Sequence, residues 1–125
     1  MTVVITDEQE KIAIPTDWTG KINRVAEICL QEEEIDPKAE IGLMFVDNEQ
    51  IREMNSAYRD KDSATDVLSF PMYEADEAIE DEEEILLGDI VISLERAAEQ
   101  AEEYGHSLER EVMYLLVHGL RPYGG

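Results

Sequence analysis

Apolar and polar positions along the chain follow two periods, one of about two residues and one of about 3.6 residues. Short β-prone runs occupy residues 2–5, 41–46, 67–70 and 86–93. The run "IGLMFV" at 41–46 is apolar on both faces, which favours a central strand. Pro71 follows the third run and is expected to end it, because proline cannot donate to a strand ladder. The pattern therefore predicts four strands.

Helical periodicity follows the first strand. Pro15 introduces a segment in which Thr16 or Asp17 can serve as the N-cap. Apolar residues then recur every three or four positions, which is typical of a helix with one buried face. They are Trp18, Ile22, Val25 and Cys29. This stripe predicts that Cys29 packs in the core and is not a nucleophile.

A second helix is predicted directly after the second strand. Asp47 and Gln50 have the spacing of a capping box, in which each side chain bonds the backbone N–H of the other. The helix behind them is expected to bury Ile51, Met54 and Tyr58. The polar stretch after it, "RDKDSATD", is expected to be a loop.

Two more helices are predicted in the last third of the chain. Ser93 and Ser107 each stand where a helix would begin, and Gly105 is a suitable C-terminal stop between them. The last helix has apolar residues at core spacing: Leu108, Val112, Leu115, Leu116 and Gly119. The element order is therefore β-α-β-α-β-β-α-α. It predicts an α+β fold, a single domain over residues 1–125 with a small mixed sheet of about four strands packed with about four helices. The strand order does not follow from the pattern.

Charge and composition restrict the partners. The formal net charge of −21 opposes non-specific binding to the phosphate backbone of nucleic acids, although part of it lies in the acidic block at 73–84, which is expected to be a solvated loop. The local charge around Arg52, Arg59 and Lys61 is less acidic, so the composition does not exclude RNA binding. No run approaches the roughly 18 apolar residues that cross a bilayer. A single cysteine favours a reducing, cytoplasmic location.

His118 is the candidate for chemistry, at the end of the last apolar helix. It is either a core histidine or a metal ligand. Two histidines at i and i+4 share a helical face and can hold one ion, but position 122 is a proline. His106 lies in a turn, and nothing in the sequence brings it near His118. Spacing alone therefore does not give a metal site.

The segments "NSAYRDKDSATDVLSFP", "LLGDIVIS" and "YLLVHGL" carry a resemblance. In this order and at these separations they resemble the YbeY family of metal-dependent endoribonucleases, strongly from Ile41 to Leu120. The resemblance implies zinc-dependent hydrolysis of phosphodiesters in single-stranded ribosomal RNA, in ribosomal RNA maturation and ribosome quality control. It also implies small-subunit ribosomal proteins as partners. No DNA and no membrane partner is expected.

The resemblance also implies site residues. His118 matches the first of three histidines that hold zinc, whose bound water would have a pKa of about 7. Arg59 matches a catalytic arginine that stabilises negative charge on the phosphoryl oxygens. Thr65, Asp66 and Ser69 match the same motif and are expected to fix the loop and the strand.

The C-terminal residues depart from the family motif. Pro122 stands where a second histidine is expected, and the third would lie beyond Gly125, so the chain is C-terminally short relative to the family. With one of three histidines we expect zinc binding no tighter than about millimolar, because a full site is worth ~10–16 kcal/mol over four ligands. We also expect the last five residues to be frayed and apolar surface near Leu115 and Leu120 to be exposed.

Three functions stay open at this point. One is an endoribonuclease of this family whose C-terminal metal motif is truncated or altered. Another is a non-catalytic descendant that binds RNA or a ribosomal protein. The third is an acidic interaction module that shares only the fold.

Overall fold

The order of strands and helices along the chain is the one that the apolar pattern predicts. The computed structural model describes residues 2–30, 39–59, 65–71 and 85–121. Its elements are β1 (Thr2–Asp7), α1 (Trp18–Leu30), β2 (Ala39–Val46), α2 (Asn48–Arg59), β3 (Val67–Pro71), β4 (Ile85–Ser93), α3 (Leu94–Tyr104) and α4 (Leu108–Leu120). The predicted α+β class is therefore confirmed. The acidic block at 73–84 lies outside the described residues.

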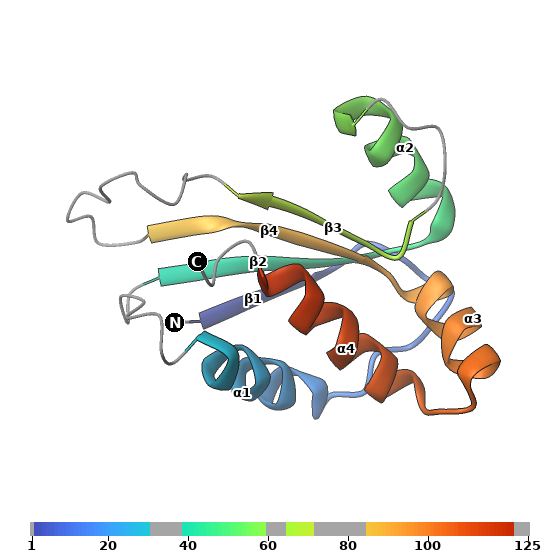
Figure 1. Ribbon diagram of the computed structural model, residues 1–125, viewed down its shortest axis with the longest axis horizontal. Coiled ribbons are helices and arrows are strands. Elements are labelled where there is room, and N and C mark those ends of the chain that lie inside the picture. The colour runs from blue at the N-terminus through green and yellow to red at the C-terminus, as the bar shows by residue number, and fades with distance from the viewer. Residues whose placement is uncertain (1, 31–38, 60–64, 72–84, 122–125) are drawn as a thin grey trace.

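The strands form one mixed sheet in the order β1-β2-β4-β3 (Figure 1). β1, β2 and β4 run parallel, and β3 pairs antiparallel with β4. β2 lies between two strands, which confirms the central position predicted from its two apolar faces. β3 is an edge strand of the sheet. The pairings Asp7 with Phe45 and Ser93 with Val46 place the ends of all three parallel strands together.

Helices cover the two faces of the sheet unequally. α1, α3 and α4 lie on one face, and α2 lies on the other, near β3 (Figure 1). The larger core fills the space between the sheet and α1 and α4, and the smaller one lies under α2. Buried residues of the larger core include Ile22, Leu43, Phe45, Ile90 and Leu116. The smaller core is built on Val46, Ile51, Leu68 and Val91.

The caps predicted for the second, third and fourth helices are present. Ser93 Oγ and Ser107 Oγ each accept a bond of 3.1 Å from the backbone N–H three residues on. Asp47 and Gln50 bond each other's backbone N–H, at 2.8 and 2.9 Å. Gly105 ends α3 with a φ of 70°, a conformation that glycine adopts without steric cost. Each cap of this kind stabilises its helix by about 1 kcal/mol.

Cys29 is exposed, so the prediction that it packs in the core is wrong. The buried positions of α1 are Trp18, Ile22, Ala26 and Leu30. Ala26 and Leu30 supply the contacts of the last two turns, and Cys29 lies beside them on the solvent side. The stripe read from the sequence was therefore displaced by one position in its second half.

Apolar surface near Leu115 and Leu120 is exposed at Tyr114 and Val117, whereas Leu115 and Leu120 themselves are buried, with 1% and 2% of their surfaces accessible. Both side chains lie on the face of α4 that packs on the sheet and α1, so other elements cover them whatever follows the helix. Residues 122–125 lie outside the described part of the chain. Among the helices that are described, none has the length and apolar content to cross a membrane.

Candidate functional site

His118 lies in the last turn of α4 with its side chain exposed to solvent. The apolar neighbours that suggested a core position, Leu116 and Leu120, point to the other side of the helix and are buried. Of the two interpretations of His118, the core histidine is therefore excluded, and the imidazole is free to meet a ligand.

Close backbone packing fixes the position of this helix end. A Cβ atom on Gly119 would lie 2.8 Å from Ile90 Cγ2 and 3.3 Å from Val67 Cγ2, so only glycine lets α4 approach the sheet this closely. Ser69 Oγ also donates a 2.8 Å hydrogen bond to the carbonyl oxygen of Gly119. Ser69 thus joins β3 to the end of α4, and the neighbouring His118 is held relative to both β3 and β4.

Arg59 is the last residue of α2, and its side chain lies outside the described part of the structure. Its helix packs on the opposite face of the sheet, where Ile51 contacts the cluster that includes Leu68. Leu68 and Ser69 are successive residues of β3 and point to opposite faces. The helices that carry Arg59 and His118 therefore meet the same edge strand from its two sides. The catalytic role of Arg59 stays a prediction.

A buried polar cluster between α3 and α4 was not predicted. Glu111 is 2% exposed, and its carboxylate oxygens lie 2.5 Å from His106 Nε2 and 3.0 Å from Gln100 Nε2. Gln100 Nε2 also lies 3.5 Å from Asp66 Oδ2. The burial of Glu111 could have been predicted from the sequence, because helical spacing places this residue one turn before Leu115 on the core face of α4.

The same cluster forms the floor of a hollow of about 440 Å³ between α3 and α4. Its lining residues are Asp66, Gln100, Tyr104, His106, Arg110, Glu111 and Tyr114. His106 precedes α4 and His118 ends it, so about 15 Å of helix, at 1.5 Å per residue, separates the two histidines. They do not form one site.

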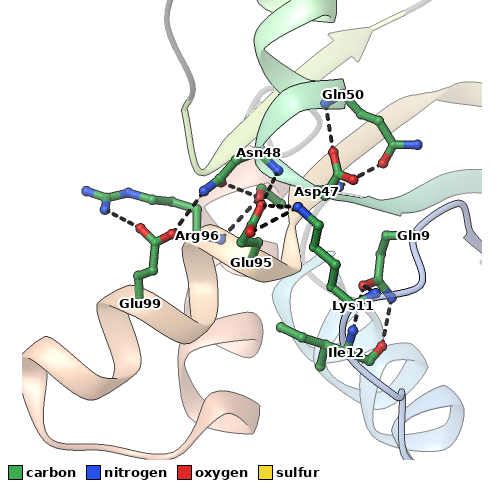
Figure 2. A network of polar contacts seen from close by, with 10 residues as sticks. Gln9, Lys11, Ile12, Asp47, Asn48, Gln50, Glu95, Arg96 and Glu99 are labelled. Carbon is green, nitrogen blue, oxygen red and sulfur yellow. Dashed lines mark hydrogen bonds and ion pairs between the residues drawn. The ribbon is translucent and has the colours of Figure 1, made fainter.

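A second polar network lies where the parallel strands end (Figure 2). Lys11 Nζ lies 3.2 Å from Glu95 Oε2, and this hydrogen bond raises the pKa of Lys11. The backbone N–H of Asn48 donates to the same carboxylate at 3.0 Å. The carboxyl ends of parallel strands often bind ligands, but here the polar groups bond one another and join the segments that follow β1, β2 and β4.

The hollow beside this network, about 510 Å³, is acidic. Its lining residues are Asp7, Glu8, Gln9, Glu10, Lys11, Asp47 and Gln50. Four carboxylates face one amine in this set, so the field at this end of the sheet repels phosphate groups. Binding of a nucleic acid at this end of the sheet is therefore electrostatically unfavourable.

The described residues do not fit a zinc ion. A catalytic zinc site needs three protein ligands and an open position. Within the described ranges, no three histidine, cysteine, aspartate or glutamate side chains are grouped so that they could hold a metal. Of the ligands that such a site needs, His118 supplies one nitrogen.

The comparisons with known proteins are decisive for the family. The sequence model of the family described as Endoribonuclease YbeY matches residues 4–121, a range that takes in all four described helices. The chain belongs to the YbeY endoribonuclease family. The resemblance read from the sequence is thereby confirmed.

Relatives in the YbeY family match along nearly all of the chain. Proteins named Endoribonuclease YbeY from Caldanaerobacter subterraneus subsp. tengcongensis and Desulforamulus reducens are 50% and 49% identical. The matches cover 96% and 95% of this chain, and 80% and 78% of those proteins. The solution structure of TM1509 from Thermotoga maritima is similar with a TM-score of 0.66 at 23% identity, covering 99% of this chain and 73% of that one. This last similarity supports the fold alone.

Proposed function

We propose that this YbeY-family chain is an endoribonuclease that hydrolyses phosphodiesters in single-stranded RNA during ribosomal RNA processing. His118 is proposed as a zinc ligand, and Arg59 as the cation that stabilises charge on the phosphoryl group. Small-subunit ribosomal proteins and a cytoplasmic location belong to the same proposal. The family match over residues 4–121 carries it.

The geometry around α4 supports a role for His118. Its imidazole is exposed, while the adjacent Gly119 is packed against Ile90 and bonded to Ser69. A side chain on a rigid backbone and open to solvent is suited to binding, because little ordering entropy is lost when a ligand arrives. An exposed histidine without a role would not need a neighbouring residue packed as closely as Gly119 is.

Zinc affinity is the first property to measure. A full site is worth ~10–16 kcal/mol over four ligands, or roughly 3–4 kcal/mol per ligand, so His118 alone gives an affinity of about millimolar. Position 122 follows His118 by four residues, the spacing at which two histidines of a helix share a face. Pro122→His should therefore tighten zinc binding by about 100- to 1000-fold. Calorimetric titration of the wild type, His118→Ala and Pro122→His measures this directly.

The outcome of the titration is unambiguous. A one-to-one micromolar site in the wild type that is lost in His118→Ala would show that other atoms of the chain complete the site. Equal affinity of the wild type and Pro122→His would show that a histidine at position 122 does not join His118 in binding the metal.

Cleavage of a labelled single-stranded RNA tests the activity. We expect cleavage by the wild type only at millimolar zinc, and by Pro122→His at much lower zinc. His118→Ala should abolish it, and Arg59→Gln should reduce kcat. Arg24→Gln, on the exposed surface of α1, is the matched control and should be unchanged. Absence of cleavage by both the wild type and Pro122→His at saturating zinc would refute the proposal.

A second candidate is a non-catalytic family member that binds RNA or a ribosomal protein. The proline at position 122 favours it, because proline offers no donor atom to a metal. This candidate predicts that the wild type binds RNA without cleaving it and that Arg59→Glu weakens the binding. Binding that is the same in Arg59→Glu and wild type would count against this candidate.

A further inference from the structure

The exposed face of α4 carries a continuous row of side chains, of which the proposed chemistry uses only His118. The row consists of Arg110, Tyr114, Val117, His118 and Arg121, all exposed. Their spacings of three and four residues place them on one side of the helix. From Arg110 to Arg121 the row is about 16 Å long, at 1.5 Å per residue.

The two arginines of this row stand out in a chain with 31 acidic and 10 basic residues. Lys11, Lys21 and Arg96 are each paired with a carboxylate. Neither Arg110 nor Arg121 is ion-paired with any residue that the structure describes. Two guanidinium charges that no described carboxylate pairs with thus lie on the exposed face of α4, in a protein whose net charge is strongly negative.

An aromatic side chain stands between these arginines. Tyr114 is 64% exposed, and Tyr104 on α3 is exposed to the same degree. Both line the hollow between α3 and α4, together with Arg110. The exposed ring of Tyr114 offers a flat surface for stacking. It lies one helical turn from Arg110 and one turn from His118.

We propose that this face of α4 binds single-stranded RNA, with a base stacked on Tyr114 and phosphates bound by Arg110 and Arg121, and leads the strand to His118. The inference rests on the proposed function, which puts RNA chemistry at His118, and adds the path of the substrate. Alternating cations and aromatic rings are how proteins hold single strands without reading their sequence. The row supplies both, with Tyr114 between the two arginines.

Binding of a fluorescein-labelled oligouridine to the full chain, measured by anisotropy with no metal added, tests the stacking contact. Tyr114→Ala should weaken binding by about 5- to 100-fold, the usual effect of removing one base–aromatic stack. Tyr114→Phe keeps the ring and should bind within about twofold of the wild type. Tyr114 is mostly exposed, so circular dichroism of both variants should match the wild type.

The salt dependence of binding tests the arginines. Each phosphate contact with a single strand adds about 0.7 to the slope of log affinity against log salt. Arg110→Gln and Arg121→Gln should each lower that slope by about 0.7. Arg24→Gln is the matched control, because Arg24 lies on α1 next to Glu27, and should leave the slope unchanged.

Polyphosphate separates base stacking from attraction to any polyanion. It carries phosphates without bases, so Tyr114→Ala should bind it as the wild type does. Equal weakening toward polyphosphate and RNA would overturn the stacking contact. Unchanged RNA binding in all α4 variants would overturn the whole inference, and so would a wild type that binds no RNA, which would leave this face to a protein partner.

The proposed RNA path along α4 and the proposed nuclease activity can be refuted separately. Cleavage at high zinc that is indifferent to Tyr114→Ala would overturn the path along α4 and leave the nuclease standing. RNA binding that depends on Tyr114 without any cleavage would support the path and refute the nuclease.

Discussion

Gly119 and Gly20 offer a matched test of how α4 is packed. Both glycines lie in helices of 13 residues. A Cβ atom on Gly20 would meet nothing within 4 Å, whereas one on Gly119 would lie 2.8 Å from Ile90 Cγ2. We predict that Gly20→Ala stabilises the protein and that Gly119→Ala destabilises it, although both replace glycine by a better helix former.

The magnitudes follow from two opposing effects. Alanine is favoured over glycine in a helix by up to about 1 kcal/mol, and both variants gain this amount. At Gly119 the new methyl lies well inside the ~3.5–4.0 Å at which carbon atoms attract, and overpacking of this kind costs about 1–3 kcal/mol. Ile90 is fully buried in β4, so its methyl cannot move into solvent. The free energy of unfolding should rise by about 0.5–1 kcal/mol in Gly20→Ala and fall by about 0–2 kcal/mol in Gly119→Ala.

Urea unfolding measures the difference. The single tryptophan, Trp18, is 4% exposed in the core, so its fluorescence reports on unfolding. With a slope of about 1–3 kcal/mol per molar urea, a difference of about 2 kcal/mol separates the two midpoints by about 1 M. If Gly119→Ala proves as stable as Gly20→Ala, the end of α4 does not pack on β4 as described, and the placement of His118 loses its support.

Two further predictions concern polar contacts. Glu111→Ala should lower the free energy of unfolding by about 2–4 kcal/mol, because it leaves the buried Gln100 amide with only the long contact to Asp66. Glu111→Gln keeps an acceptor for Gln100 and should cost about 1 kcal/mol, so equal losses in urea unfolding would contradict this role. At Lys21, hydrogen bonds to Glu109 and Asp17 raise the lysine pKa above 10.5, and the same contact lowers the pKa of Asp17 below 3.8. The raised lysine pKa gives stability that is lost as pH rises through it, and the lowered Asp17 pKa gives stability that is lost as pH falls through it. The loss of stability in Lys21→Gln should therefore be largest between about pH 4 and pH 10 and shrink with added salt, and a pH-independent loss in thermal unfolding would contradict the ion pairing.

The local features of the fold could be predicted because their causes are local in the sequence. The capping box at Asp47 and the serine caps depend on residues three apart, and β2 is central because both of its faces are apolar. Strand order depends on contacts between segments far apart in the chain. The position of β4 between β2 and β3 was therefore not available from periodicity.

The error at Cys29 and the burial of Leu120 have the same physical origin. Exposure of Cys29 and burial of Leu120 both depend on which other elements pack nearby. A helical stripe predicts which face is buried, and it does not say how far along the helix a neighbour extends. Near helix ends this uncertainty is largest, because the partner element can stop earlier or continue further than the helix itself.

The site could be predicted only in part. The resemblance selected His118, and the structure adds that Gly119 and Ser69 fix its backbone. The cluster of Glu111 and His106 was missed because the buried face of the last helix was predicted from its apolar residues alone. Its burial becomes intelligible only when α3 supplies Gln100 as a donor.

The distribution of charge decides from which side a polyanion can reach this protein. At the carboxyl ends of β1, β2 and β4 the polar groups bond one another, and the adjoining hollow is lined by carboxylates (Figure 2). RNA approaching there would meet repulsion from these carboxylates. Along α4 the described arginines have no such partners, and the row passes His118 near the end of the helix, beside the edge strand β3. A substrate guided by electrostatics would therefore arrive along α4, and the helix that fixes the proposed metal ligand would also be the one that delivers the strand to it.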